Sequence, residues 1–116
     1  LTFPTVEHAY QAMKSPRREA WLEILDQPTP GRAKRLGAFV HIRPNWNQLK
    51  IPIMRMLLRK KFQIPELRKG LIETHPFHLE ETNTWGDTFW GVNNGKGENH
   101  LGKLLMQIRN EIHGHQ

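Results

Sequence analysis

Helix-starting residue pairs divide this chain into short segments. Ser15-Pro16 and Thr29-Pro30 each place a capping side chain before a proline, which is favoured at the first helical position. Between such breaks, apolar residues recur at the three- and four-residue spacing of one helix face. Helices this short are marginal alone and must pack against one another. The sequence therefore predicts a mainly α (α+β) fold, with helices and a little short-strand structure.

The expected elements follow from these signals. We expect helices over residues 5–14, from Ser15-Pro16 to Pro28, over 31–36 with Gly37 after its end, from Arg43-Pro44-Asn45 onward, from Ile64-Pro65 onward, and after a capping Asn99. Pro52 predicts a kink or a late start in the fourth of these helices. Short strands are expected at residues 38–42, 78–82 and 88–90.

Charge and composition restrict the function. The 116 residues include 17 Lys plus Arg and 11 Asp plus Glu, a formal net charge of +6. A basic surface attracts phosphate esters, nucleotides or nucleic acid, although many basic domains bind no anion. The chain contains no cysteine, which excludes a thiolate nucleophile and a Cys-ligated zinc. No apolar run reaches the ~20 residues of a membrane span, so we expect a cytoplasmic protein without a membrane partner.

A polar stripe marks the first expected helix. Glu7, Gln11 and Lys14 follow the spacing i, i+4, i+7 and so share one face. A carboxylate and an amine on one face are candidates for catalysis. The alternative is a surface pair that contributes a few tenths of a kcal/mol.

Two aromatic residues flank an acid in the segment 85–91. Trp85 and Trp90 surround Asp87, and Gly91 follows. Indole rings stack on bases, and a carboxylate stabilises a developing cation or activates water. The alternative is a turn whose tryptophans pack into the core.

A glycine-rich loop runs into the last expected helix. Gly95 lets the backbone approach a ligand, Lys96 adds positive charge, and the free N–H groups after Asn99 favour an anion. The alternative is a flexible loop. The seven histidines form no metal-binding signature, so we expect no metal site.

Together these residues resemble the NADAR or YbiA-like N-glycosidase family. The first block is Thr-x-Glu-His-x-x-Gln-Ala-x-Lys, residues 5–14. The likeness continues in the same order over nearly the whole chain, through Asn45-Trp46, Lys50, Met54, Lys61-Phe62, Asp87, Trp90-Gly91, Gly95–Gly102, Leu104–Met106 and Arg109.

The resemblance implies a mostly helical single domain that cleaves N-ribosidic bonds. The implied substrates are ADP-ribose attached to guanine and the phosphoribosylamino-pyrimidine intermediates of riboflavin synthesis. The essential acid of the family falls on Glu7, its lysine on Lys14 and its aspartate on Asp87. Its pocket tryptophans fall on Trp46 and Trp90.

The chain departs from the family at its start. Family members usually carry an upstream Phe-Ser-Asn-Phe-like segment that helps form the phosphate and ribose pocket. The numbered residues begin after that point, so we expect one domain over residues 1–116 that lacks this segment or does not show it.

Cleavage of a ribosyl C–N bond leaves positive charge on C1′ and O4′ of the sugar. Glu7 or Asp87 suits the stabilisation of that charge or the activation of water, while Lys14 suits attack on the sugar to give a Schiff base. We expect catalysis by these three residues without metal or cofactor. Substrate binding is expected from Gln11, Trp46, Lys50, Trp90, Gly91, Gly95, Lys96 and Asn99.

Two rival functions remain open at this stage. The same residues would suit a module that binds ADP-ribose or a nucleotide without cleaving it. The basic residues Arg17-Arg18 and Arg55–Lys61 would suit a nucleic-acid-binding protein, which is compatible with an enzyme whose target base is carried by a nucleic acid. The sequence gives no oligomeric state.

Overall fold

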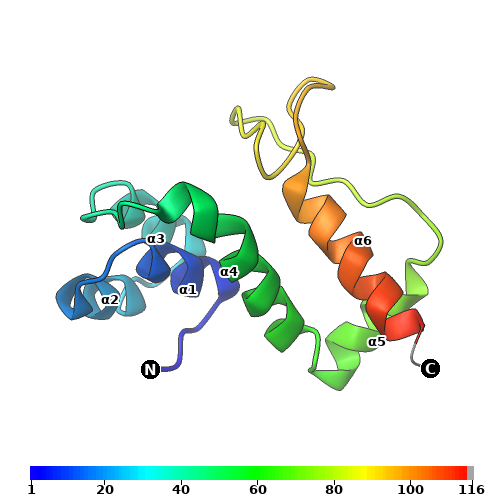
Figure 1. Ribbon diagram of the computed structural model, residues 1–116, viewed down its shortest axis with the longest axis horizontal. Coiled ribbons are helices and arrows are strands. Elements are labelled where there is room, and N and C mark those ends of the chain that lie inside the picture. The colour runs from blue at the N-terminus through cyan, green and yellow to red at the C-terminus, as the bar shows by residue number, and fades with distance from the viewer. Residues whose placement is uncertain (115–116) are drawn as a thin grey trace. The chain divides into compact units, whose positions relative to one another are not determined.

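Six helices make up most of residues 1–114, the part of the chain that the computed structural model describes (Figure 1). This confirms the mainly helical prediction. The chain divides into two compact units, Leu1–Leu57 and Leu58–Gln116. The expectation that the chain forms one domain stays a prediction.

The caps of α1 (Val6–Met13) and α3 (Pro30–Gly37) are those that the sequence predicts. Thr5 Oγ1 accepts a hydrogen bond from the His8 N–H at 3.1 Å, and Thr29 Oγ1 accepts one from the Arg32 N–H at 3.1 Å. Each bond satisfies one of the N–H groups that a helix start leaves without a partner. Gly37, expected after α3, is instead its last residue.

The start predicted for the second helix is wrong. α2 spans Arg18–Leu25, and no side chain caps it. Ser15 Oγ accepts a hydrogen bond from the Arg17 N–H at 3.1 Å, and the Ser15 carbonyl accepts one from Trp21 Nε1 at 2.7 Å. Ser15 is fully buried, so it stabilises the turn between the two helices rather than the start of α2.

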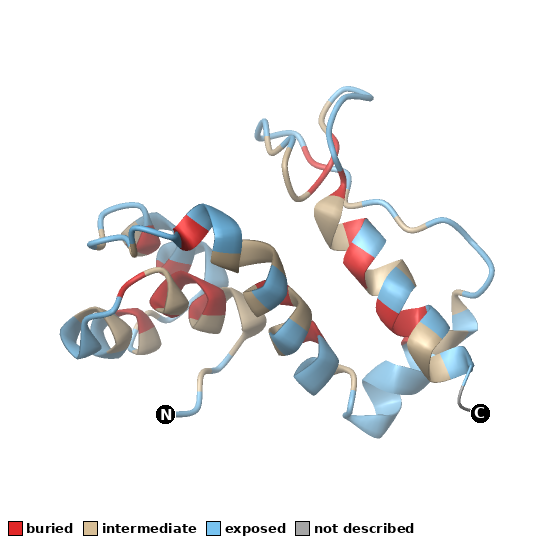
Figure 2. Ribbon diagram, in the orientation of Figure 1, coloured by how far each residue is buried: buried red, intermediate tan, exposed pale blue. Residues whose placement is uncertain are grey.

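The core of the first unit lies among its first three helices. α1 packs against α2 and α3, and these two helices also contact each other. Their centre is formed by Ala12, Ile24 and Ala33, with Phe3, Trp21, Leu36 and Val40 packed around it. Alanine at two of the three central positions lets the helices approach closely, and buried residues gather on their facing sides (Figure 2).

α4 (Trp46–Lys61) runs continuously through Pro52, so a late start there is wrong. Pro52 is exposed on the helix, where water can satisfy the carbonyl group that loses its N–H partner.

The second unit contains a packed helix pair, α5 (Pro65–Glu73) and α6 (His100–His113). Its buried apolar residues are Leu58, Leu71, Val92, Leu104 and Ile108. Buried Arg109 donates from Nη1 to the Phe77 carbonyl at 2.7 Å and to Thr74 Oγ1 at 3.0 Å, which fixes the end of α5 to α6. Leu67 of α5 is 38% exposed, so this apolar side chain does not belong to the core of the unit.

Isolated bridges replace the expected strands in the part of the chain described. Thr82 pairs with Val92, and Asn93 pairs with Lys96; residues 38–42 and 88–90 form no strand. Asn94 and Gly95, between the second pair, have φ values of 52° and 74°. Asn-Gly with two positive φ values is typical of a two-residue hairpin turn, and this signal in the sequence was missed.

Asn99 does not cap α6 with its side chain. Its Nδ2 donates to the Leu79 carbonyl at 3.0 Å, and its Oδ1 accepts from the Glu81 N–H at 3.0 Å. Its φ of 54° lies in the left-handed region, which asparagine tolerates better than most residues. Asn99 therefore ties the loop before α6 to the start of that helix.

We expect Asn99→Ala to lower the free energy of unfolding by about 2 kcal/mol, because two partly buried backbone groups lose their partners and alanine strains a left-handed backbone. Urea denaturation followed by circular dichroism measures this change. Asn110→Ala, at an exposed position of α6, is the matched control and should cost well under 1 kcal/mol. Equal effects of the two substitutions would contradict this account of Asn99.

Candidate active site

The polar face of α1 is partly buried rather than a free surface. Gln11 is only 3% exposed, and its Nε2 donates a hydrogen bond to Glu7 Oε1 at 3.1 Å. Glu7 in the first turn of α1 and Lys14 directly after its last residue are both half-buried. The Gln11 amide therefore holds the Glu7 carboxylate at a defined position. A pair of charges on a free surface would have no such restraint.

Lys14 lies in surroundings that favour its neutral amine. Burial lowers the pKa of Lys14 below its usual value, and the positive charges of Lys34 and Lys50 lower it further, while the negative charge of Glu7 opposes the shift. Its Nζ lies 5.9 Å from the centre of the Tyr10 ring. A lysine whose amine is deprotonated more readily is a better nucleophile near neutral pH.

Trp46 forms an aromatic contact beside this face. Its ring centre lies 5.2 Å from that of Tyr10 at an interplanar angle of 56°, and Trp46 is 6% exposed. The contact brings the first turn of α4 against α1. Stacking of Trp46 on a substrate base stays a prediction.

Arg43 holds the end of α1, a role that the sequence analysis missed. Its backbone N–H donates to the Lys14 carbonyl at 2.8 Å, its Nε to the Met13 carbonyl at 2.8 Å, and its Nη2 to the Ser15 carbonyl at 3.2 Å. A helix end leaves its last carbonyl groups without partners, and Arg43 supplies them. No local pattern could reveal contacts between residues so far apart in the chain.

In the second unit, Asp87 organises the turn that carries Trp90. Asp87 Oδ1 accepts hydrogen bonds from the N–H groups of Phe89 at 3.1 Å and Trp90 at 2.9 Å. The Trp90 ring contacts those of Phe89 and His100, with centres 4.9 and 6.4 Å away. These contacts give Asp87 a positioning role, and its participation in bond cleavage stays a prediction.

The first N–H groups of α6 are not free for an anion, contrary to the expectation for this loop. The His100 N–H donates to the Phe89 carbonyl at 3.1 Å, and the Leu101 N–H donates to the Trp90 carbonyl at 2.9 Å. Lys96 is exposed at the hairpin that Gly95 closes. Phosphate binding by Gly95 and Lys96 stays a prediction.

Gly91 is buried, and a Cβ there would overlap the Glu81 carbonyl oxygen. Packing within the loop therefore explains why a glycine occupies position 91. Substrate binding by Gly91 and by Asn99, whose amide already has two partners, stays a prediction.

The predicted residues fall into two groups, one in each unit. The first unit brings Glu7, Gln11, Lys14, Trp46 and Lys50 onto α1 and the start of α4. The second unit holds Asp87, Trp90, Gly91, Gly95, Lys96 and Asn99 in the loop before α6. Lys34, which the sequence analysis did not select, joins the first group through its charge on Lys14.

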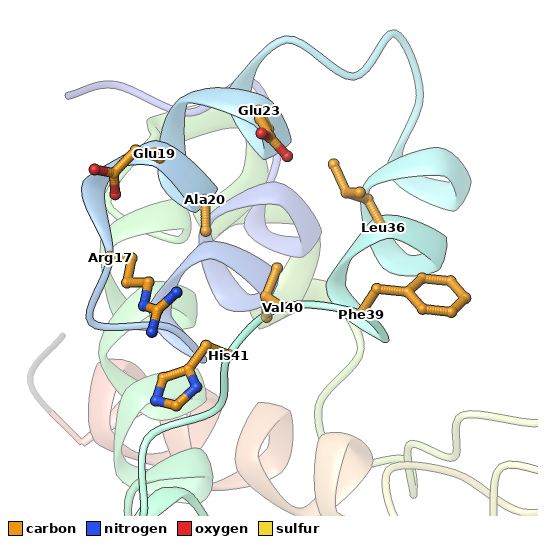
Figure 3. A pocket seen from close by; sticks show the side chains of 8 residues that line it. All are labelled: Arg17, Glu19, Ala20, Glu23, Leu36, Phe39, Val40 and His41. Atoms are coloured by element: carbon orange, nitrogen blue, oxygen red, sulfur yellow. The ribbon is translucent and has the colours of Figure 1, made fainter.

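A separate hollow of about 600 Å³ lies on the first unit (Figure 3). Arg17 and His41 approach it from different segments, and Phe39 beside it is 83% exposed. It is lined by Arg17, Glu19, Ala20, Glu23, Leu36, Phe39, Val40 and His41. Of these residues, the sequence analysis selected only Arg17, as part of a basic surface that would suit nucleic acid.

Over residues 1–114, no group of three or more His, Asp or Glu side chains is arranged to hold a metal ion. Among the helices described there, none has the length and apolar character needed to cross a membrane.

Comparison with known proteins finds a family and several relatives that match nearly the whole chain. The NADAR domain family matches residues 1–113. The N-glycosidase YbiA of Shigella boydii is 42% identical over 115 residues, which cover 96% of this chain and 71% of the relative. The chloroplastic riboflavin biosynthesis protein PYRR of Zea mays is 38% identical over 98% of this chain and 20% of its own length.

A solved structure shows the same fold. The NMR structure of the E. coli protein YbiA matches with a TM-score of 0.87 and 38% identity, covering 97% of this chain and 69% of that one.

The surroundings of Lys14 predict pKa changes of opposite sign. Glu7→Gln should lower the pKa of Lys14 further, because it removes the opposing negative charge, whereas Lys50→Gln should raise it, because it removes a positive charge. NMR titration of the Lys14 side-chain nitrogen measures both. Shifts in the same direction, or none, would show that these groups do not act on Lys14 as described.

Proposed function

We propose that this chain, which belongs to the NADAR domain family and is an N-glycosidase, breaks the bond between C1′ of a phosphorylated ribose or ADP-ribose and a nitrogenous base. The observation that carries the proposal is the half-buried amine of Lys14 on one helix face with the Glu7 carboxylate. Phosphoribosylamino-pyrimidines are a candidate substrate class because a riboflavin biosynthesis protein is among the relatives.

Glu7 acts on the charge that develops in the sugar. As the C–N bond stretches, positive charge spreads over C1′ and O4′, and a fixed carboxylate stabilises it more in the transition state than in the ground state. The hydrogen bond from Gln11 Nε2 keeps Glu7 in place, so the carboxylate does not have to be ordered during the reaction.

Lys14 attacks C1′ through its neutral amine. A bond forms between Nζ and C1′ as the bond from C1′ to the base breaks, and the base takes a proton as it leaves. Opening of the sugar ring then gives a Schiff base between Nζ and C1′. Water hydrolyses this imine, which releases the sugar phosphate and restores the amine. The alternative route is direct attack of water on C1′ with Glu7 as the base.

The base could be carried by a small metabolite or by a nucleic acid. The candidates are a small phosphoribosyl metabolite, free ADP-ribosylated guanosine, and the same modification in a single-stranded nucleic acid. The release of free base from each, measured by chromatography, identifies the class. Binding without release from any of them would instead favour the non-catalytic module. We propose the cytoplasm as the compartment, since the absence of cysteine fits a reducing environment.

We expect Glu7→Gln to lower kcat at least about a hundredfold, the contribution typical of a positioned acid or base, while circular dichroism stays unchanged. Glu19→Gln, at an exposed position of α2, is the matched control and should keep normal turnover. Normal turnover of a folded Glu7→Gln protein would remove Glu7 from the mechanism.

Reduction with borohydride during turnover should attach the sugar phosphate covalently to the wild-type chain, and mass spectrometry should place the adduct on Lys14, because borohydride reduces the imine. Lys14→Ala should form no adduct. Lys103→Ala, at an exposed position of α6, should form it normally. A wild-type enzyme that turns over substrate but never traps an adduct would exclude the Schiff base and leave direct attack by water.

A further inference from the structure

One side of α3 carries two arginines and leads to an exposed phenylalanine. Arg32, Arg35 and Phe39 follow one another at spacings of three and four residues, so they share one side of the helix and of the turn that continues it. All three are exposed. The buried residues Ala33 and Gly37 belong to a different side of α3. The packing of α3 within its unit therefore leaves the arginine side open to solvent.

A second hollow, of about 290 Å³, lies on this side of α3, lined by Gln27, Arg32, Arg35, Leu36 and Phe39. Its wall is a fixed part of the unit. The Gln27 carbonyl oxygen lies 2.9 Å from Nε2 of the buried His8, and Gln27 Nε2 donates to the Glu23 carbonyl at 3.0 Å. The hollow therefore does not depend on an unrestrained loop.

The second hollow carries positive charge without a balancing acid. No acidic side chain among residues 1–114 lines it, and neither Arg32 nor Arg35 forms an ion pair within that part of the chain. Glu19 and Glu23 line the neighbouring hollow of Figure 3, which shares Phe39 with this one. An anion is therefore attracted to the arginine side of Phe39 rather than to the glutamate side.

Phe39 adds an aromatic face to this charge. The side chain is 83% exposed, and its ring points away from Val40 and His41 in Figure 3. An aromatic ring stacks on a nucleobase whatever the base is, and guanidinium groups bind phosphate through paired hydrogen bonds. A single-stranded nucleic acid offers both groups in alternation along one chain.

We propose that Phe39 stacks on a base of a single-stranded nucleic acid while Arg32 and Arg35 bind its phosphate groups. A protein partner fits this surface less well. Its apolar lining consists of Leu36 and Phe39, whereas a stable protein interface buries about 1,200–2,000 Å² around several anchoring side chains. The proposal goes beyond the function proposed above, because the strand binds whether or not a glycosidic bond is cleaved.

Fluorescence anisotropy with a labelled oligothymidylate of about twelve nucleotides tests the stacking contact. The wild-type chain should bind it, and Phe39→Ala should weaken binding about tenfold, the loss typical of one stacked base. Circular dichroism should stay unchanged, because the side chain is mostly exposed. Phe39→Trp should bind at least as tightly as the wild type, since the larger ring keeps the stacking surface.

The same titration at several salt concentrations tests the phosphate contacts. Arg35→Gln should weaken binding about threefold to tenfold and reduce the slope of log K against log salt by about 0.7, the value for one phosphate of a single strand. Arg18→Gln is the matched control, because it removes one positive charge from an exposed position of α2 that lines neither hollow. It should weaken binding by less than about twofold.

Several outcomes would overturn the proposal. Absence of binding by the wild-type chain, or equal binding by Phe39→Ala, would show that no base stacks there. A loss with Arg18→Gln as large as that with Arg35→Gln would indicate attraction by overall charge. Equally tight binding of the duplex with oligoadenylate would exclude recognition of unpaired bases. Binding of a polyglutamate peptide that is as tight and depends equally on Phe39 would instead assign the surface to an acidic protein.

Discussion

The close approach of α3 to α1 at Gly37 is the contact on which the candidate active site depends. Because Gly37 has no side chain, Gln11 fits between the two helices and is almost completely buried. A buried amide needs a partner for its donor group, and the Glu7 carboxylate provides it at 3.1 Å. The position of the proposed catalytic carboxylate is therefore tied to the packing of α1 against α3.

The other end of α1 is fixed by a different device. Arg43 reaches back across the chain and supplies donors to the carbonyl groups of Met13, Lys14 and Ser15. These bonds restrain the backbone from which the Lys14 side chain extends. A nucleophile must lie within a few tenths of an ångström of its attacking position, and a frayed last turn of helix would not hold it there. Gln11 and Arg43 thus restrain the two proposed catalytic residues independently.

The sequence predicted the features that depend on neighbouring residues. Thr5 and Thr29 each accept a hydrogen bond from the N–H group three residues later. Because both partners lie in one short segment, the sequence reveals the cap. The shared face of Glu7, Gln11 and Lys14 follows from helical periodicity alone. Ser15 carries the same local signal as Thr29, yet it is buried and stabilises a turn. The Ser15 carbonyl accepts a hydrogen bond from Trp21 Nε1, a tertiary contact that the capping pattern does not reveal.

Features that depend on distant residues escaped prediction for the same reason. Asn99 looks like a cap in the sequence, but its amide bonds Leu79 and Glu81, about twenty residues earlier. Lys34 and Arg43 act on residues at the C-terminal end of α1 and just after it, which lie 20 to 30 positions earlier in the chain. Both enter the site because α1 packs on α3 and receives the Arg43 contacts. A family motif marks residues that share a local pattern, whereas the charge balance around Lys14 arises only when three helices meet. Burial and the charges of Glu7, Lys34 and Lys50 act on the pKa of Lys14 only in the folded chain, where these groups are brought together.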